Sequence, residues 1–110
     1  MNDTKNQIIE FASFTLAESS DESSLVAASD ALHTEFLSQQ KGFIRRDLVK
    51  LSDGKWADVV YWESRESVEK AMQNAPANPA ALRYFQLMDN NGQNDPSGGI
   101  MLLSIAKSYS

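Results

Sequence analysis

Residues 42–71 read GFIRRDLVKLSDGKWADVVYWESRESVEKA, and this stretch decides the fold of the chain. Two runs rich in β-branched and aromatic residues flank the dipeptide Asp53-Gly54, which is typical of tight hairpin turns. The stretch therefore predicts a β-hairpin, with one strand over residues 43–51 and a second over residues 55–62.

A helix is expected directly after this hairpin. Ser64 is a suitable N-cap, because its hydroxyl can accept a hydrogen bond from a free amide in the first helical turn. The helix is predicted to run through Asn74 and to be interrupted at Pro76, since proline lacks the amide donor that a helix interior requires. Asn78 and Pro79 then restart it, as a cap followed by a first-turn proline.

Three further elements are predicted outside this region. Residues 8–16, IIEFASFTL, indicate a strand with apolar side chains on both faces, and residues 25–40 show the apolar spacing of a helix that ends before Gly42. Residues 89–99 have the composition of a loop. Residues 100–106, IMLLSIA, predict a last strand, and their continuous apolar character favours a central or doubly covered position.

The predicted element order is β-α-β-β-α-β over a single domain that spans residues 1–110. This order is typical of an α+β, ferredoxin-like fold, in which a four-stranded antiparallel sheet carries both helices on one face. The other face of the sheet would then expose apolar side chains, and such a surface indicates an interface. We therefore expect a homodimer that forms through the open sheet face.

Composition excludes several classes of function. The chain has 110 residues and a formal net charge of −5, whereas nucleic-acid binding needs clustered Lys and Arg. It contains no cysteine, which excludes disulfides and thiolate sites, and its single histidine argues against a histidine-rich metal site. No apolar run approaches the ~20 residues of a membrane span. We expect a cytoplasmic protein with no membrane partner.

The hairpin and the helix after it resemble the antibiotic biosynthesis monooxygenase family of the dimeric α/β-barrel superfamily. The predicted order of elements extends this resemblance over residues 8–106. The residues that carry the resemblance are Gly42-Phe43-Ile44, the Asp53-Gly54 turn, Trp62-Glu63-Ser64 and Ala71.

The resemblance implies a homodimer whose two sheets form a barrel, with a cleft between the sheet and the helices of each subunit. Some members of the family oxidise polyphenolic substrates with dioxygen and use neither metal nor flavin. In those members the substrate carbanion reduces dioxygen, and the protein supplies a base, a dry cavity and hydrogen bonds. The resemblance therefore implies no cofactor.

The haem-degrading branch of the superfamily fits this sequence poorly. That branch relies on an asparagine, a tryptophan and a histidine at positions that hold Ala12, Ala71 and Leu82 here. No histidine follows His33 in the chain, so haem degradation is not expected.

Asp58 is the first candidate for a catalytic residue. Strand parity places it on the same face as Trp56 and Trp62, where a carboxylate is desolvated and its pKa is raised. A raised pKa is how a carboxylate becomes a general base near neutral pH. The alternative is that Asp58 forms a structural ion pair with Arg45 or Arg46.

His33 is the second candidate for a catalytic residue, because histidine alone titrates near neutrality without perturbation. If its helix covers the face that carries Asp58, the two side chains could form a His–Asp pair that removes a proton from a phenol or an activated carbon. The alternative is a structural histidine at the edge of the core.

Three residues are candidates for binding a ligand. Trp62 could form a cleft wall that stacks on an aromatic molecule, although large aromatic side chains commonly fill cores. Arg83 and Tyr84 could bind an anion or phenolate at the mouth of the cleft, or belong to a solvated helix face.

Three functional hypotheses remain open at this point. The first is a cofactor-independent monooxygenase that acts on a small aromatic or polyketide-like molecule. The second is a non-catalytic protein that binds a small ligand in the same cleft. The third is a structural dimeric module whose cleft is filled by its own side chains.

Overall fold

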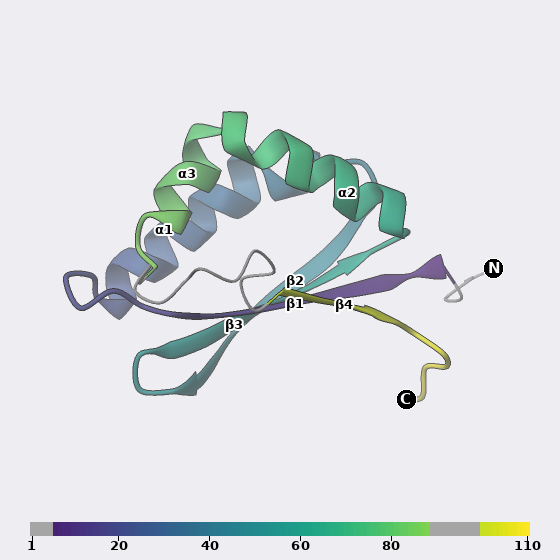
Figure 1. Ribbon diagram of the computed structural model, residues 1–110, viewed down its shortest axis with the longest axis horizontal. Coiled ribbons are helices and arrows are strands. Elements are labelled where there is room, and N and C mark those ends of the chain that lie inside the picture. The colour runs from purple at the N-terminus through teal and green to yellow at the C-terminus, as the bar shows by residue number, and fades with distance from the viewer. Residues whose placement is uncertain (1–5, 89–99) are drawn as a thin grey trace.

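A four-stranded antiparallel sheet carries all the helices on one of its faces (Figure 1). The computed structural model describes residues 6–88 and 100–110. The strands are β1 (Ile8–Thr15), β2 (Phe43–Ser52), β3 (Lys55–Trp62) and β4 (Ile100–Ser104), in the spatial order β2-β3-β1-β4. The helices are α1 (Glu22–Glu35), η2 (Leu37–Gln39), α2 (Arg65–Asn74), η3 (Ala75–Ala77) and α3 (Pro79–Phe85). The ferredoxin-like α+β prediction is confirmed.

Side-chain caps fix where the helices begin. The Asp21 carboxylate accepts a hydrogen bond from the Ser24 amide, and Ser64 and Asn78 cap α2 and α3 in the same way. Each cap satisfies amides that have no partner within the helix. The caps at Ser64 and Asn78 were predicted from the sequence, and both are confirmed.

The first helix differs from the prediction at both ends. It begins at Glu22 rather than Leu25, because Asp21 supplies the cap. It also ends at Glu35, since Phe36 adopts a non-helical backbone with φ −135°, and the separate turn η2 follows.

The last strand lies at an edge of the sheet, so a central position is wrong, while coverage of both its faces stays a prediction. In the order β2-β3-β1-β4, the two central strands are β1 and β3. The side chains of β4 alternate between the two sheet faces, and apolar residues occupy both. Leu102 packs on the core, while Met101 and Leu103 are exposed on the open face. The loop expected over residues 89–99 lies outside the described residues.

Strand register decides which side chains meet the helices. Glu10 is paired with Val60, Ala12 with Asp58 and Phe14 with Trp56, and all of these lie on the face that the helices cover. Trp62 packs on the same side and is 1% exposed, so it belongs to the core. The covered face of the central strands therefore mixes large aromatics with two carboxylates.

The opposite face of the sheet has no helix over it among the described residues (Figure 1). Met101 and Leu103 pair with Phe11 and Ile9 in register, so these four apolar side chains share that face. Within the described residues, no helix is both long enough and apolar enough to cross a bilayer.

Candidate functional site

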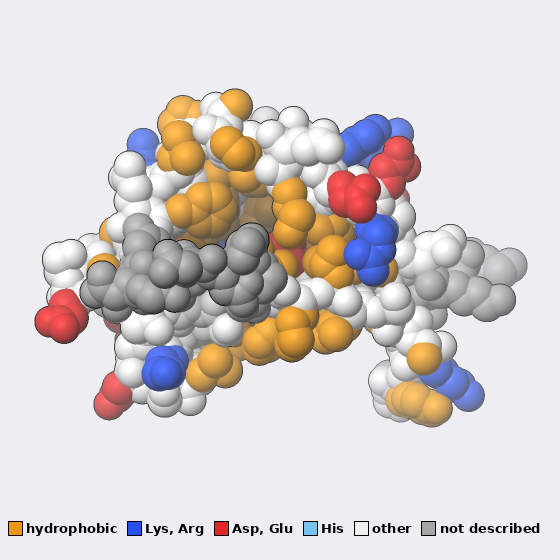
Figure 2. Space-filling view, viewed as in Figure 1, with side chains coloured by type: hydrophobic (Ala, Val, Ile, Leu, Met, Phe, Trp, Pro, Cys, Tyr) orange, Lys and Arg blue, Asp and Glu red, His pale blue; other side chains and the backbone are white. Residues whose placement is uncertain are grey.

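A cavity of about 410 Å³ lies between the covered face of the sheet and the helices. Figure 2 shows hydrophobic side chains gathered around this hollow. Its walls are mostly apolar, and the charged or phenolic groups among the lining residues are Glu10, Arg46, Asp58 and Tyr84. The lining also includes Ala12, Phe14, Leu32, Phe36, Leu37, Val60, Trp62, Ala71, Met72, Ala75, Pro76, Phe85, Met88 and Ile100.

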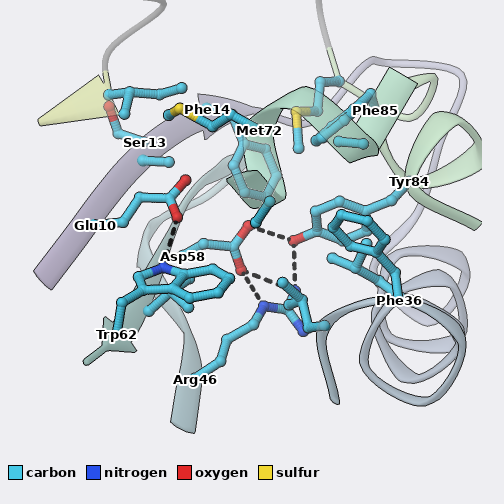
Figure 3. A pocket seen from close by; sticks show the side chains of 18 of the residues that line it. Glu10, Ser13, Phe14, Phe36, Arg46, Asp58, Trp62, Met72, Tyr84 and Phe85 are labelled. Atoms are coloured by element: carbon cyan, nitrogen blue, oxygen red, sulfur yellow. Dashed lines mark hydrogen bonds and ion pairs between the residues drawn. The ribbon is translucent and has the colours of Figure 1, made fainter. Parts of the chain in front are cut away.

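Arg46, Asp58 and Tyr84 form a closed hydrogen-bonded cluster at one wall of the cavity (Figure 3). The Arg46 guanidinium donates from Nε to Oδ1 of Asp58 at 2.9 Å, and its Nη2 lies 2.8 Å from the same oxygen in an ion pair. The Tyr84 hydroxyl donates to Oδ2 of Asp58 at 2.9 Å and accepts from Nη2 of Arg46 at 3.0 Å. The cluster thus joins β2, β3 and α3 through three side chains.

Burial governs the protonation of this cluster. It raises the pKa of Asp58, and the neighbouring Arg46 charge and the Tyr84 hydrogen bond oppose that rise. Burial and the Asp58 carboxylate both raise the pKa of Tyr84, so the phenol keeps its proton and acts as a donor. With Arg46 beside it, Asp58 is a paired carboxylate.

Glu10 is the second carboxylate of the cavity, and it is placed differently (Figure 3). The Trp62 indole donates from Nε1 to Oε1 of Glu10 at 3.0 Å. Burial and, to a smaller extent, the nearby Asp58 charge raise the pKa of Glu10. The Trp62 hydrogen bond and the Arg46 charge lower it, but the net pKa is raised. The protein therefore presents a partly desolvated carboxyl to the cavity, held by one hydrogen-bond donor.

Three of the predicted site residues lie together in this cavity. Asp58, Trp62 and Tyr84 all line it, and Tyr84 also packs edge-on against Phe14, with ring centroids 6.0 Å apart. The ion pair of Asp58 with Arg46, which the sequence left open as an alternative, is present.

The structure does not bring the other two predicted site residues to the cavity. His33 is exposed on α1, and its ring packs against Phe43 at a centroid distance of 5.7 Å. The expected His33–Asp58 pair is not formed, because the Asp58 oxygens bind Arg46 and Tyr84 instead. Arg83 is exposed on α3 and does not line the cavity, since it neighbours Tyr84 in the helix and points to a different side.

Two charged residues of the cavity were not among the sequence candidates. Glu10 shares strand parity with Ala12 and Phe14, so an acidic residue amid that apolar alternation was a usable signal. Arg46 appeared only as a possible partner of Asp58, yet it organises the whole cluster. No group of three or more metal-ligating side chains occurs within residues 6–88 and 100–110.

Solved structures of similar shape are known, although no protein-family model and no curated protein matches this sequence. One is a point mutant of SnoaB, described as a cofactor-independent oxygenase from Streptomyces nogalater. It superposes with a TM-score of 0.71 at 14% identity, covering 94% of this chain and 96% of its own. A second is named as a candidate antibiotic biosynthesis monooxygenase from Bordetella bronchiseptica, with a TM-score of 0.67 at 15% identity and 94% and 99% coverage.

This chain has the fold of an antibiotic biosynthesis monooxygenase. The family resemblance noted in the hairpin is thus confirmed at the level of the fold. A third structure with this fold, Rv0793 from Mycobacterium tuberculosis, shows 20% identity and a TM-score of 0.57, with 94% of this chain and 97% of that chain covered. Identities this low leave activity and substrate to be argued from the cavity itself.

Proposed function

We propose that this protein is a cofactor-independent monooxygenase that acts on a small aromatic or polyketide-like molecule. The observation that carries the proposal is the apolar cavity, which is about 410 Å³ in volume and has two carboxyls in its sheet wall. Pockets of this size bind small organic molecules, and a few polar groups within apolar walls orient them. The similarity in fold to a named cofactor-independent oxygenase supports the same reading.

The chemistry requires a substrate with an acidic C–H bond. Loss of the proton leaves a carbanion, which transfers electrons to dioxygen directly. For dithranol, a hydroxylated anthrone, one dioxygen converts the ring methylene to a carbonyl, giving the corresponding anthraquinone and one water. The protein has to exclude bulk water and hold the developing anion, and apolar walls with fixed hydrogen-bond donors suit both tasks.

The proposal assigns a role only to those sequence candidates that line the cavity. Asp58 holds the Tyr84 hydroxyl and the Arg46 guanidinium at the cavity wall, and Trp62, which is buried in that wall, donates its indole N–H to Glu10. His33 and Arg83 have no role, because both are exposed away from the cavity. The cytoplasmic location expected from the sequence stays a prediction.

A ligand-binding role without catalysis is the alternative, and the same cavity supports it. A structural module with a cleft filled by its own side chains is disfavoured by the cavity volume. The two remaining hypotheses differ in whether a bound carbon acid is oxidised.

Dithranol serves as the probe that separates them. We expect it to quench tryptophan fluorescence under nitrogen on binding, and in air to consume one dioxygen per anthraquinone formed, faster than in buffer alone. Ala71→Leu should weaken binding by about tenfold, because the added methyl groups fill the cavity. The measurements are a fluorescence titration and oxygen-electrode rates.

Ala27→Leu is the matched control, since it makes the same change on an exposed face of α1. Its affinity for dithranol should equal that of the wild-type chain. Binding without faster oxygen uptake would favour the non-catalytic alternative, and no binding at all would overturn both.

We also propose that two copies associate through the open sheet face. Met101 and Leu103 are 51% and 43% exposed there, beside Phe11 and Ile9 of β1. Exposed apolar side chains that adjoin in one sheet face favour burial against a partner. A second copy offers the same surface by symmetry.

Sedimentation equilibrium at micromolar concentration is expected to give twice the 12.2 kDa chain mass. Met101→Glu should give a monomer, because each interface would bury two uncompensated charges. Leu82→Glu is the control, since Leu82 is 44% exposed on α3 rather than on the sheet face. A wild-type monomer mass would contradict the proposed dimer.

A further inference from the structure

We propose that Glu10 is the proton acceptor of the cavity and that the Trp62 indole N–H positions it. The inference rests on the proposed function, in that it assigns the base of that reaction to a residue outside the sequence candidates. Glu10 would take the proton of an acidic C–H bond on the carboxylate oxygen that Trp62 does not bind.

Strand geometry places Glu10 at the centre of the sheet wall. It lies on β1 opposite Val60 of β3. Asp58 and Trp62 lie on either side of Val60 along β3 and share its sheet face. Figure 3 shows its carboxylate beside the Trp62 indole, at the cavity wall formed by the central strands. Trp62 binds Oε1 at 3.0 Å, and among the described residues Oε2 has no hydrogen-bond partner.

Asp58 is much less suited to the same task. Both of its oxygens accept hydrogen bonds, Oδ1 from Nε of Arg46 and Oδ2 from the Tyr84 hydroxyl, and Oδ1 also forms the ion pair with Arg46. The Arg46 charge is paired with Asp58. Within residues 6–88 and 100–110, no Lys, Arg or His side chain forms an ion pair with Glu10. Of the two cavity carboxyls, Glu10 is therefore the one with an oxygen available to a ligand.

The charges around Glu10 set how strongly it accepts a proton. Glu10 shares the cavity lining with Asp58 from β3, Arg46 from β2 and the phenol of Tyr84 from α3, while the α2 residues of the lining carry no charge. Burial raises the pKa of Glu10, and Asp58 adds to the effect while Trp62 and Arg46 oppose it. A carboxylate with a raised pKa is a stronger base and remains ionised at neutral pH when the rise is modest.

The step balances with dioxygen as the only co-reactant. The C–H bond of the substrate breaks, its electron pair stays on the substrate carbon and the proton forms an O–H bond with Glu10. The carbanion then reduces dioxygen and forms a C–O bond, which gives a substrate peroxide. Its O–O bond breaks together with the second methylene C–H bond, so that one oxygen leaves as water and the other remains as the carbonyl. The proton on Glu10 departs with that water, which restores the carboxylate.

Hydrogen–deuterium exchange at the dithranol methylene tests the proton step without oxygen. In D₂O under nitrogen, the wild-type chain is expected to accelerate exchange over buffer, and Glu10→Gln to lower that rate by about 100-fold, the lower range for loss of a general base. Glu35→Gln, at an exposed position on α1, is the matched control and should exchange at the wild-type rate. NMR of the methylene signal measures the exchange.

Trp62→Phe tests the positioning role and does not depend on whether Glu10→Gln folds. The Trp62 hydrogen bond lowers the pKa of Glu10, so its removal should raise that pKa and move the rising limb of the exchange rate to higher pH. A purely structural role would lower the rate at every pH and leave the limb in place, which would overturn the assignment for Trp62.

Two results would overturn the assignment for Glu10: wild-type exchange no faster than in buffer, or Glu10→Gln exchange at the wild-type rate. Exchange that depends on Glu10 without oxygen uptake in air would support Glu10 as the base and contradict only the monooxygenase proposal. The two proposals therefore fail on different measurements.

Discussion

Replacing Asp58 with asparagine is expected to lower the free energy of unfolding by about 3–5 kcal/mol, the range for breaking a buried ion pair. The side chains of Arg46 and Asp58 are 6% and 11% exposed, so the substitution leaves a guanidinium charge buried without its counterion. The Tyr84 hydroxyl would also lose a charged acceptor. Urea unfolding measures the change, and the melting temperature should fall by roughly 10–20 °C.

Asp47→Asn is the control on the same sheet. Asp47 pairs with Arg45 at 3.2 Å, but these side chains are 47% and 60% exposed, and such pairs contribute about 1 kcal/mol or less. The double substitution Arg46→Met with Asp58→Leu should recover most of the stability lost in Asp58→Asn, because it removes both charges. Equal losses in Asp58→Asn and Asp47→Asn would show that the buried cluster does not hold the fold.

Replacing Gly42 with alanine is expected to lower the free energy of unfolding by about 2–5 kcal/mol, combining left-handed backbone strain with overpacking. Gly42 has φ +87°, and an added Cβ would press against the Ser67 hydroxyl and lie 2.6 Å from the Ser67 Cβ. Ser67 lies in the first turn of α2, where its amide donates to the Ser64 cap. The clash would therefore disturb the start of α2 as well as the turn.

Gly54→Ala isolates the backbone contribution. Gly54 has φ +75°, nearly the same conformation, yet nothing lies within 4 Å of the position a Cβ would take. We expect its loss to be about 1–2 kcal/mol, from backbone strain alone. Denaturant unfolding of both variants measures the difference, and equal losses would mean that the contact with Ser67 is not a constraint.

The fold was predictable because its signals are local. The Asp53-Gly54 turn and the Ser64 and Asn78 caps each depend on a few neighbouring residues, and all three were found. The break after Glu35 was missed, since the apolar spacing runs through Phe36 and Leu37 without a glycine or proline to end the helix. The edge position of β4 was missed for another reason, because an apolar run does not show which strands pair with it.

The cavity was harder to predict, because it depends on contacts between distant residues. Asp58 was found through strand parity, but its partner Tyr84 lies 26 positions later in the sequence, and no local pattern joins them. His33 was a candidate for its proton chemistry and because its helix was expected to cover the face that carries Asp58, but its position around the α1 axis leaves it exposed. Glu10 shares strand parity with Ala12 and Phe14, but apolar residues on both faces dominate the pattern of this strand.

The walls of the cavity differ in what they contribute. Its charged and phenolic groups come from the sheet and α3, whereas the segment from α2 to η3 provides uncharged side chains alone: Ala71, Met72, Ala75 and Pro76. Under the proposed function, substitutions along this one segment would alter the size and shape of the molecule that the cavity accepts without disturbing the Arg46–Asp58 ion pair. For a monooxygenase of the proposed kind, substitutions in α2 after gene duplication would be a route to new substrates that leaves the charged and phenolic groups in place.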